Sequence, residues 1–328
     1  MRFPDSRLRR RRKNDAIRSM VRESHLRPED FIAPLFIVEG EGVKNEIPSM
    51  PDYFRYSLDM LKAELDELVE AGIRSVLLFV KVPEELKDNK GTEALNEEGL
   101  MQRSIRYIKK EFPDLYVMTD VALDPYSSYG HDGIVKDGEI VNDLSSQVLA
   151  AMALSHARAG ADMVAPSDMM DGRIGAIRKE LDQYGYENTG IMSYSAKYAS
   201  AYYGPFRDAL DSAPGFGDKK AYQMDPANVK EAILETQFDI DEGADIVMVK
   251  PGLPYLDVVR AVSRKFDVPV SVYHVSGEYA MLKAAAEKGW LNEEEVMMES
   301  LTAFKRAGAD LIATYFAKDA ARILNNRS

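Results

Sequence analysis

The stretch Glu242-Gly243-Ala244-Asp245-Ile246-Val247-Met248-Val249-Lys250-Pro251-Gly252 decides the fold of this chain. Its first glycine predicts the end of a helix, because glycine adopts the left-handed conformation without steric cost. The apolar run that follows is typical of a short strand covered on both faces. The same helix–glycine–strand phrase recurs as Ala71-Gly72-Ile73, Ala159-Gly160-Ala161-Asp162 and Ala307-Gly308-Ala309-Asp310.

Apolar runs of this kind recur along the whole chain, separated by segments with helical periodicity. The eight predicted strands are residues 31–38, 75–80, 116–123, 163–166, 190–196, 245–249, 269–275 and 310–316. Helical periodicity is clearest over residues 58–69, 148–159 and 229–240. Alternating strands and helices predict parallel strands with crossover helices, and eight such units predict a closed (β/α)8 TIM barrel. A doubly wound open sheet is the alternative, but neither G-x-G-x-x-G nor a P-loop follows any predicted strand.

Polar residues stand where these strands end, which is the rim that carries the chemistry in (β/α)8 barrels. In strand order they are Asp120 and Asp124, Ser167 and Asp168, Lys197, Lys250, Ser276 and Tyr315. One lysine at a strand end is usually a solvated cap. Two of them facing one pocket would lower each other's pKa, and a neutral amine attacks carbonyls to form Schiff bases. The pair therefore favours an enzyme acting on a ketone or aldehyde.

Other candidate residues lie in the loops that follow the third and fifth strands. Asp120, Asp124 and Asp132 either move protons or hold a hard cation, or they are ordinary turn residues. Residues 204–223 form a long segment that is either a lid or a surface loop; its Arg207, Lys219, Lys220 and Gln223 would suit a substrate carboxylate. The four histidines lack metal-ligand spacing; we expect a structural His156 and a His131 near the site.

Composition narrows the class of protein. The 328 residues include no cysteine, which excludes disulfides, thiolate catalysis and a cysteine zinc site. Net charge is −12, yet residues 2–13 are rich in arginine, which predicts either an arm that packs on another subunit or, less favoured, nucleic-acid binding. No apolar run reaches the ~18 residues of a membrane span, so we expect a cytoplasmic protein without membrane contact. We divide the chain into an extended N-terminal arm, residues 1–30, and a catalytic barrel, residues 31–328.

Several motifs together resemble the porphobilinogen synthase, or 5-aminolevulinate dehydratase, family. The matching stretches are Ser193-Tyr194-Ser195-Ala196-Lys197-Tyr198-Ala199-Ser200, Tyr203-Gly204-Pro205-Phe206-Arg207, Met248-Val249-Lys250-Pro251-Gly252, Tyr273-His274-Val275-Ser276-Gly277-Glu278-Tyr279 and Ala165-Pro166-Ser167-Asp168-Met169-Met170-Asp171-Gly172-Arg173. The resemblance implies a hydro-lyase that condenses two molecules of 5-aminolevulinate into porphobilinogen, an early step of tetrapyrrole synthesis. A Schiff-base aldolase on the same barrel is the alternative enzyme, but it would need only one strand-end lysine.

The resemblance also implies roles for individual residues. Lys250 would hold one substrate as a Schiff base and Lys197 the other, with the three acids Asp120, Asp124 and Asp132 as catalytic groups. The remaining implied substrate contacts are Ser276 and Tyr315 for the first carboxylate, Arg207, Lys219 and Gln223 for the second, and Phe206 and Ser167. The family often has arginine where Lys219 stands.

The metal is where this chain departs from the zinc-dependent members. Those members have three cysteines in the segment after the third strand; here, in residues 120–133, alanine and aspartates occupy the cysteine positions, so soft zinc coordination is lost. Oxygen ligands favour Mg²⁺ or a monovalent cation, or the acids act without a metal. The resemblance further implies an allosteric Mg²⁺ at Glu235 and a homo-octamer assembled through the N-terminal arm.

Overall fold

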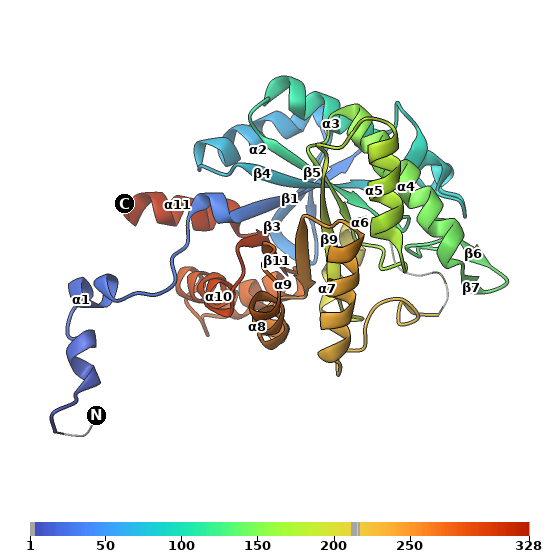
Figure 1. The fold of residues 1–328 in the computed structure, drawn as a ribbon. Coiled ribbons are helices and arrows are strands. Elements are labelled where there is room, and N and C mark those ends of the chain that lie inside the picture. Colours follow the sequence, from blue (N-terminus) through green and yellow to red (C-terminus); the bar gives the residue numbers. More distant parts are fainter. Residues whose placement is uncertain (1–3, 211–214, 216, 328) are drawn as a thin grey trace.

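A closed barrel of eight parallel strands forms the centre of the molecule in the computed structural model, which describes residues 4–210, 215 and 217–327 (Figure 1). The barrel strands are β1 (Phe31–Val38), β4 (Ser75–Lys81), β5 (Tyr116–Val121), β8 (Met163–Pro166), β9 (Gly190–Lys197), β10 (Ile246–Lys250), β11 (Val270–His274) and β12 (Leu311–Thr314). Neighbours follow chain order, and β12 pairs in parallel with β1. This last pairing closes the sheet, so the predicted TIM barrel is confirmed and the open sheet is wrong.

Helices cover the outside of the barrel. They are α2 (Leu58–Glu70), α3 (Leu100–Glu111), α4 (Asn142–Ala159), α5 (Arg173–Gln183), α6 (Gly204–Leu210), α7 (Lys230–Glu242), α8 (Leu256–Lys265), α9 (Ser276–Glu287), α10 (Glu293–Ala307) and α11 (Ala317–Arg327). Gly160, Gly243 and Gly308 end three of them with φ of 105°, 110° and 115°. The recurring glycine therefore does what its position predicted: it ends the helix in the left-handed region and lets the next strand begin within a few residues.

Two hairpins and several short 3-10 helices lie outside the eight barrel strands, and these elements were not predicted. The hairpins are β2 (Lys44–Ile47) with β3 (Met50–Tyr56), and β6 (Val135–Lys136) with β7 (Glu139–Ile140). The 3-10 helices are η1 (Leu8–Arg12), η2 (Pro28–Asp30), η3 (Glu84–Leu86), η4 (Thr92–Leu95), η5 (Ala201–Tyr203) and η6 (Leu253–Tyr255). Such short elements carry too few residues for a detectable period.

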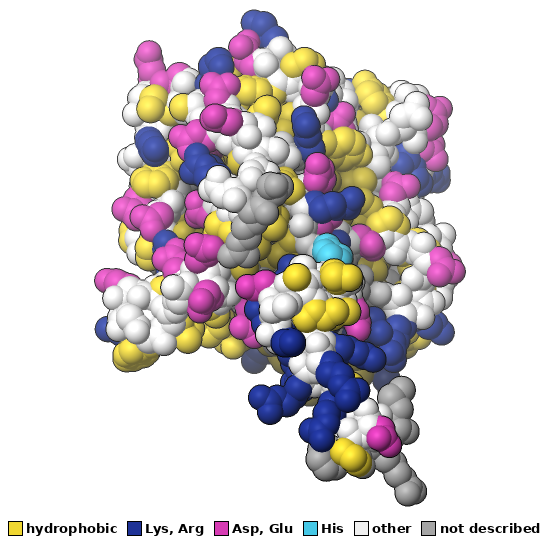
Figure 2. Space-filling model, turned by 90° about the vertical axis from the view of Figure 1, so that its left-hand side faces the viewer, with side chains coloured by type: hydrophobic (Ala, Val, Ile, Leu, Met, Phe, Trp, Pro, Cys, Tyr) yellow, Lys and Arg dark blue, Asp and Glu magenta, His cyan; other side chains and the backbone are white. Residues whose placement is uncertain are grey.

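The N-terminal arm leads away from the barrel and carries η1 and α1 (Asp15–Met20) (Figure 1). None of the residues of η1 or α1 is buried, and Figure 2 shows lysine and arginine side chains gathered on this protruding segment. The arm thus lacks a core of its own in the single chain. The proposed boundary at residue 30 stays a prediction. Within the described residues, no helix is long and apolar enough to cross a membrane.

Candidate active site

Strand pairing brings the two lysines of the sequence analysis side by side. Lys197 is the last residue of β9 and Lys250 the last of β10, and the parallel register of the two strands places them opposite each other. Both are buried, with 6% and 5% of their surface exposed. Because the side chains of paired residues point to the same face of a sheet, both amines enter one site at the C-terminal rim.

Aromatic rings surround the amine of Lys250. Its Nζ lies 4.5 Å from the ring centre of Tyr273, 4.9 Å from Phe206, 5.1 Å from Tyr194 and 5.3 Å from Tyr203. Burial, and then the charge of Lys197, lowers the pKa of Lys250 to about 7. A large fraction of this amine is therefore neutral and nucleophilic near neutral pH. This aromatic cage was not predicted, although its three tyrosines all lie in the family-like motifs.

Three buried acids and two lysines form a second group, here called the lysine–acid cluster: Asp120, Asp124, Asp132, Lys197 and Lys219. Lys219 Nζ donates to Asp124 Oδ2 at 3.2 Å and to Asp132 Oδ1 at 3.0 Å. Lys197 Nζ lies 3.8 Å from Asp132 Oδ2 and donates to the carbonyl oxygen of Ser167. The structure therefore gathers the predicted acids around Lys197 and Lys219, and the charges of the three acids also act on Lys250.

The acids of the cluster differ in protonation. Burial raises the pKa of Asp120 to about 7, and the charge of Asp124 adds to that effect. Burial also raises the pKa of Asp124, against the attraction of Lys219. Burial acts on Asp132 in the same direction, but Lys219 and Lys197 outweigh it and lower the pKa of Asp132 to about 2. The cluster therefore holds an ionised Asp132 beside Asp120, a carboxyl that exchanges protons near pH 7.

The segment after β9 folds over this cluster. Phe206 lies on α6 against Lys250, and Arg207 follows it, half-buried, on the same short helix. The predicted lid is thus partly helical, while positions 211–214 and 216 lie outside the described residues. Further along, Gln223 is buried, and the Tyr222 hydroxyl accepts from the Asp132 amide at 3.3 Å and pairs with His131 Nδ1 at 3.1 Å. His131 is therefore near the site, as expected, whereas the part played by Tyr222 was missed.

The remaining predicted contacts also stand at the rim. Ser167 follows β8, Ser276 begins α9 and Tyr315 follows β12; all three are buried. The Ser276 hydroxyl has no hydrogen-bond partner among the described residues, so it is available to a ligand. The Tyr315 hydroxyl lies 3.1 Å from that of Tyr273. By contrast, His156 is buried in α4 against Thr119, 3.0 Å from its hydroxyl, which fits the structural role expected for it.

A buried ionic network behind the rim was not predicted. Arg173, at the start of α5, pairs with Asp239 of α7 at 3.0 Å and lies 3.7 Å from Asp168. Its guanidinium also donates to the Ser193 hydroxyl at 3.1 Å, and that hydroxyl donates to Asp239 at 2.5 Å. Asp168 was expected at the rim, but the structure turns it toward Arg173. A sequence cannot reveal such a network, because its members lie 66 residues apart in the case of Arg173 and Asp239.

Whether a metal ion fits the site depends on which ligating side chains lie close together. Within the described residues, no group of three or more His, Cys, Asp or Glu side chains is arranged to hold a metal ion. In the lysine–acid cluster the Lys219 ammonium already stands between Asp124 and Asp132, so a divalent cation does not fit between these acids.

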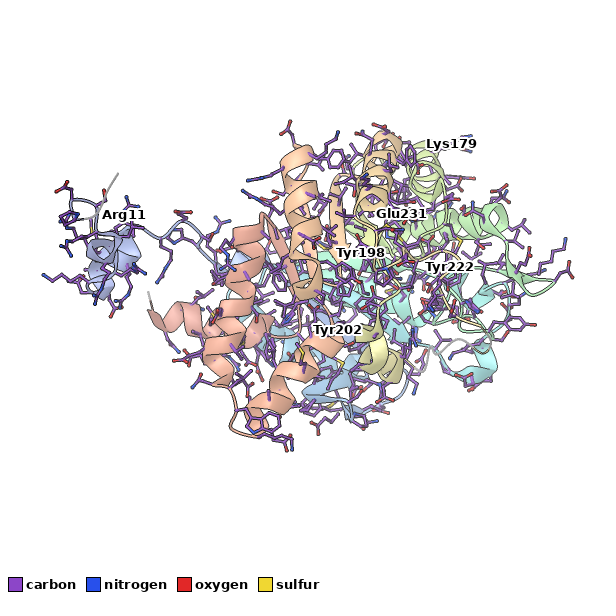
Figure 3. The ribbon with its side chains drawn as sticks, turned by 90° about the horizontal axis from the view of Figure 1, so that it is seen from below. Arg11, Lys179, Tyr198, Tyr202, Tyr222 and Glu231 are labelled. Atoms are coloured by element: carbon purple, nitrogen blue, oxygen red, sulfur yellow. The ribbon has the colours of Figure 1, made fainter. Side chains whose placement is uncertain are left out.

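Glu235 offers a different setting. It lies on α7, and with Asp171 and Glu231 it lines a cavity of about 790 Å³ that reaches Tyr222 and Gln223. Figure 3 shows Glu231 and Tyr222 on the barrel, with Arg11 apart on the arm. Burial raises the pKa of Glu235, and a cation would counter that effect. One carboxylate in a roomy, acidic cavity suits Mg²⁺, which keeps several of its waters.

A (β/α)8 barrel with two adjacent buried lysines and three buried acids at its C-terminal rim is typical of enzymes that form Schiff bases with carbonyl substrates. The sequence model of one family, delta-aminolevulinic acid dehydratase, matches residues 5–323. The chain is 54% identical to the delta-aminolevulinic acid dehydratase of Bacillus subtilis over 97% of its own length and 98% of the relative's. It is 52% identical to the dehydratase of Archaeoglobus fulgidus, over 98% and 99% of the two chains.

A solved structure agrees with these relatives. The delta-aminolevulinic acid dehydratase (porphobilinogen synthase) of Toxoplasma gondii, crystallised with its reaction product porphobilinogen, superposes with a TM-score of 0.97 at 52% identity. The match covers 98% of this chain and 92% of that one. The chain therefore belongs to the delta-aminolevulinic acid dehydratase family, as its motifs predicted.

Proposed function

We propose that this chain is a hydro-lyase that condenses two molecules of 5-aminolevulinate into porphobilinogen, through Schiff bases at Lys250 and Lys197. Family membership supports the reaction. The observation that carries the site assignment is the pairing of these two buried lysines on adjacent strands, with the pKa of Lys250 lowered to about 7. An aldolase that uses one lysine would leave the second buried amine without a purpose.

In the proposed reaction the Lys250 amine attacks the ketone of one substrate, and the other ketone reacts with Lys197. Each imine formation releases one water. An imine withdraws electrons and acidifies the neighbouring carbon, so a base removes a proton there and a carbon–carbon bond forms between the two substrates. The free amino group of one substrate then displaces the lysine of the other as the ring closes. The other lysine, now on a saturated carbon, leaves by elimination with a proton from the neighbouring carbon, and a final proton shift from carbon to nitrogen makes the ring aromatic. Both lysines thus leave as free amines, so two waters are lost overall.

Asp120 is the proposed proton carrier. It is buried in the site, its Oδ1 has no hydrogen-bond partner among the described residues, and its pKa of about 7 allows both uptake and release of a proton. Asp132 stays ionised beside Lys197 and stabilises a protonated imine there. Asp124 and Asp132 both pair with the Lys219 ammonium, so Asp124 contributes to the balance of charge in the cluster.

The two carboxylates of the substrates need separate binding groups. We assign Ser276 and Tyr315 to the first, because the Ser276 hydroxyl is buried and available. Arg207, Lys219 and Gln223 are assigned to the second, since they lie on the segment that covers the site. Phe206 and Ser167 flank the two amines, the first against Lys250 and the second at Lys197. When the second substrate binds, the Lys219 ammonium would give up its hydrogen bond to Asp124 and bind the substrate carboxylate instead.

Reductive trapping tests this proposal. The protein is incubated with 5-aminolevulinate and borohydride, and adducts are mapped by mass spectrometry. We expect adducts at Lys250 and Lys197, loss of the Lys250 adduct in Lys250→Met, and no change in Lys179→Met, which alters an exposed lysine of α5. Absence of any adduct at Lys250 in the unaltered protein would refute the mechanism.

For the metal, we propose an allosteric Mg²⁺ held by Glu235 and water, with no metal at a cysteine site. The Glu235 cavity also reaches Tyr222 and Gln223 of the covering segment, so charge neutralisation there bears on how that segment lies over the site. Isothermal titration with Mn²⁺ should show one site that Glu235→Gln removes and Glu187→Gln, an exposed control, retains. Binding that survives Glu235→Gln and is lost in Asp124→Asn would place the ion in the lysine–acid cluster instead.

We further propose a cytoplasmic homo-oligomer, an octamer, in which each arm packs on a neighbouring barrel. The arm's exposed arginines and its lack of a core support a packing role, and the chain's net charge of −12 offers acidic surface to receive it. Deletion of residues 1–13 should lower the mass measured by light scattering. If deletion abolishes only binding to nucleic acid and leaves the mass unchanged, the arm serves nucleic acid.

A further inference from the structure

Glu278 joins the two loops on either side of the first substrate position. It lies in the first turn of α9, two residues after Ser276, and is fully buried. One carboxylate oxygen accepts from the Val275 amide at 2.6 Å and the Gly252 amide at 3.3 Å, and the other accepts from the Leu253 amide at 2.5 Å. Gly252 and Leu253 belong to the turn that follows Lys250.

Helix capping explains only part of this arrangement. An acid at the third position of a helix commonly accepts from the amide that precedes the helix, which accounts for the contact with Val275. The bonds to Gly252 and Leu253 instead cross to the loop of the neighbouring strand. Burial raises the pKa of Glu278 to about 7, and the three amide donors act against it. Among the described residues no lysine or arginine forms an ion pair with this carboxyl.

The two loops are also held from their outer sides. A Cβ atom at Gly252 would lie 2.5 Å from the ring of Phe304, and one at Gly277 would lie 2.4 Å from the carbonyl oxygen of Tyr202. The turn after Lys250 and the first turn of α9 are thus packed so closely against a neighbour that a Cβ at either glycine would clash. Tyr202 belongs to η5, which contacts α9, and Figure 3 shows its position on the barrel. Glu278 supplies the bond between the loops themselves.

We propose that Glu278 is a positioning residue that fixes the separation between the Lys250 amine and the Ser276 hydroxyl. The inference rests on the proposed function, in which Lys250 binds the ketone and Ser276 the carboxylate of one substrate. Two methylene groups separate these groups in 5-aminolevulinate, so a fixed separation selects 4-oxo acids over ketones that lack a carboxylate at that distance. Glu278 touches neither group and acts through both loops.

The test compares two carbonyl probes on the full-length protein. 4-Oxopentanoate carries the ketone and the carboxylate, whereas butanone carries only the ketone. The concentration dependence of reductive trapping at Lys250 is measured for both probes in Glu278→Gln, and in Glu287→Gln as the control. Glu287 lies on the same helix but is exposed. Glutamine keeps the shape but removes the charge, and its amide nitrogen cannot accept from the backbone.

We expect Glu278→Gln to weaken trapping by 4-oxopentanoate about 10- to 100-fold, the effect of losing hydrogen bonds to a charged group, and to change trapping by butanone less than about threefold. The control should leave both unchanged. Adding Ser276→Ala to the variant should cause little further loss, because both changes remove the same contact. If Glu278→Gln does not fold, Glu278→Asp gives the same comparison.

Three results would count against the inference. Equal losses for the two probes would show that Glu278 affects only Lys250 or the general fold. Unchanged trapping of both would show that the cross-loop bonds do not matter to binding. If the unaltered protein forms no Lys250 adduct with either probe, the proposed function fails first. If the unaltered protein is trapped normally and Glu278→Gln has the same ratio of 4-oxopentanoate to butanone trapping, only the positioning role is refuted and the proposed function stands.

Discussion

Replacing Lys250 with methionine should stabilise the fold at neutral pH while it removes the proposed nucleophile. Burial, followed by the charge of Lys197, lowers the pKa of Lys250 from 10.5 to about 7. A lowering of that size corresponds to a free-energy cost of about 5 kcal/mol at neutral pH. Methionine has a similar length and no charge, so it escapes this cost.

The loss of cation–π contacts opposes this gain in the free energy of unfolding. Four aromatic rings lie 4.5–5.3 Å from the Lys250 ammonium, and methionine gives up their attraction for a cation. Allowing roughly 1 to 2 kcal/mol for that loss, we expect Lys250→Met to raise the free energy of unfolding by about 3 kcal/mol near pH 7.

The pH dependence distinguishes this cause from better packing. A lysine whose pKa is lowered in the fold destabilises the protein fully below its folded pKa, and this penalty fades as the pH rises toward its unfolded value of 10.5. The advantage of Lys250→Met should therefore be constant below about pH 7 and should shrink by about 3 kcal/mol by about pH 9.5.

Urea unfolding followed by far-UV circular dichroism at both pH values measures the effect. Chain concentrations are matched because assembly adds to apparent stability. Lys179→Met is the control, since Lys179 is exposed on α5 (Figure 3). The reasoning is wrong if Lys250→Met is no more stable than the unaltered protein at about pH 7, or if its advantage is equal at both pH values.

Three further predictions follow from the same contacts. Lys219→Met removes the buried ammonium that pairs with both Asp124 and Asp132, so the free energy of unfolding in urea should fall by about 3–5 kcal/mol, whereas Lys220→Met should be nearly neutral; equal effects would contradict the pairing. The initial rate of trapping at Lys250 should rise between about pH 6 and about pH 8, because its pKa of about 7 makes the amine neutral on the alkaline side; a flat profile would contradict the lowered pKa. Gly277→Ala places a Cβ 2.4 Å from a backbone oxygen, so its thermal midpoint should drop with a loss of about 1–3 kcal/mol; an unchanged midpoint would mean that the helix shifts freely.

The barrel was predictable because its signal is local and repeated. Each unit carries its own helix-ending glycine and apolar strand, and Gly160, Gly243 and Gly308 all adopt the expected left-handed conformation. The rim residues were predictable for the same reason, since parallel strands of a barrel all end at one side. Hairpin β2–β3 and helix α6 were missed because short elements with mixed polarity carry no clear period.

The contacts within the site were harder to predict from the sequence than the barrel was. The predicted grouping of Lys250, Lys197 and the acids rests on rim position and family resemblance, and their individual roles stay predictions. The Arg173–Asp239 pair, the Tyr222 bond to Asp132 and the cross-loop bonds of Glu278 were not foreseen. Each of these contacts joins segments far apart in the chain or depends on how a side chain is oriented. A local sequence pattern predicts neither long-range contacts nor side-chain orientation.

The sequence by itself determined the barrel, the residues at its rim and the family, because strand periodicity, glycine positions and motif identity are properties of neighbouring residues. It also excluded a cysteine zinc site outright. Only the tertiary structure decided the electrostatics: that Lys250 stands in an aromatic cage with its pKa lowered to about 7, and that Lys219 fills the space between Asp124 and Asp132. Burial and the distances between charges set both results, and these quantities exist only once the chain is folded.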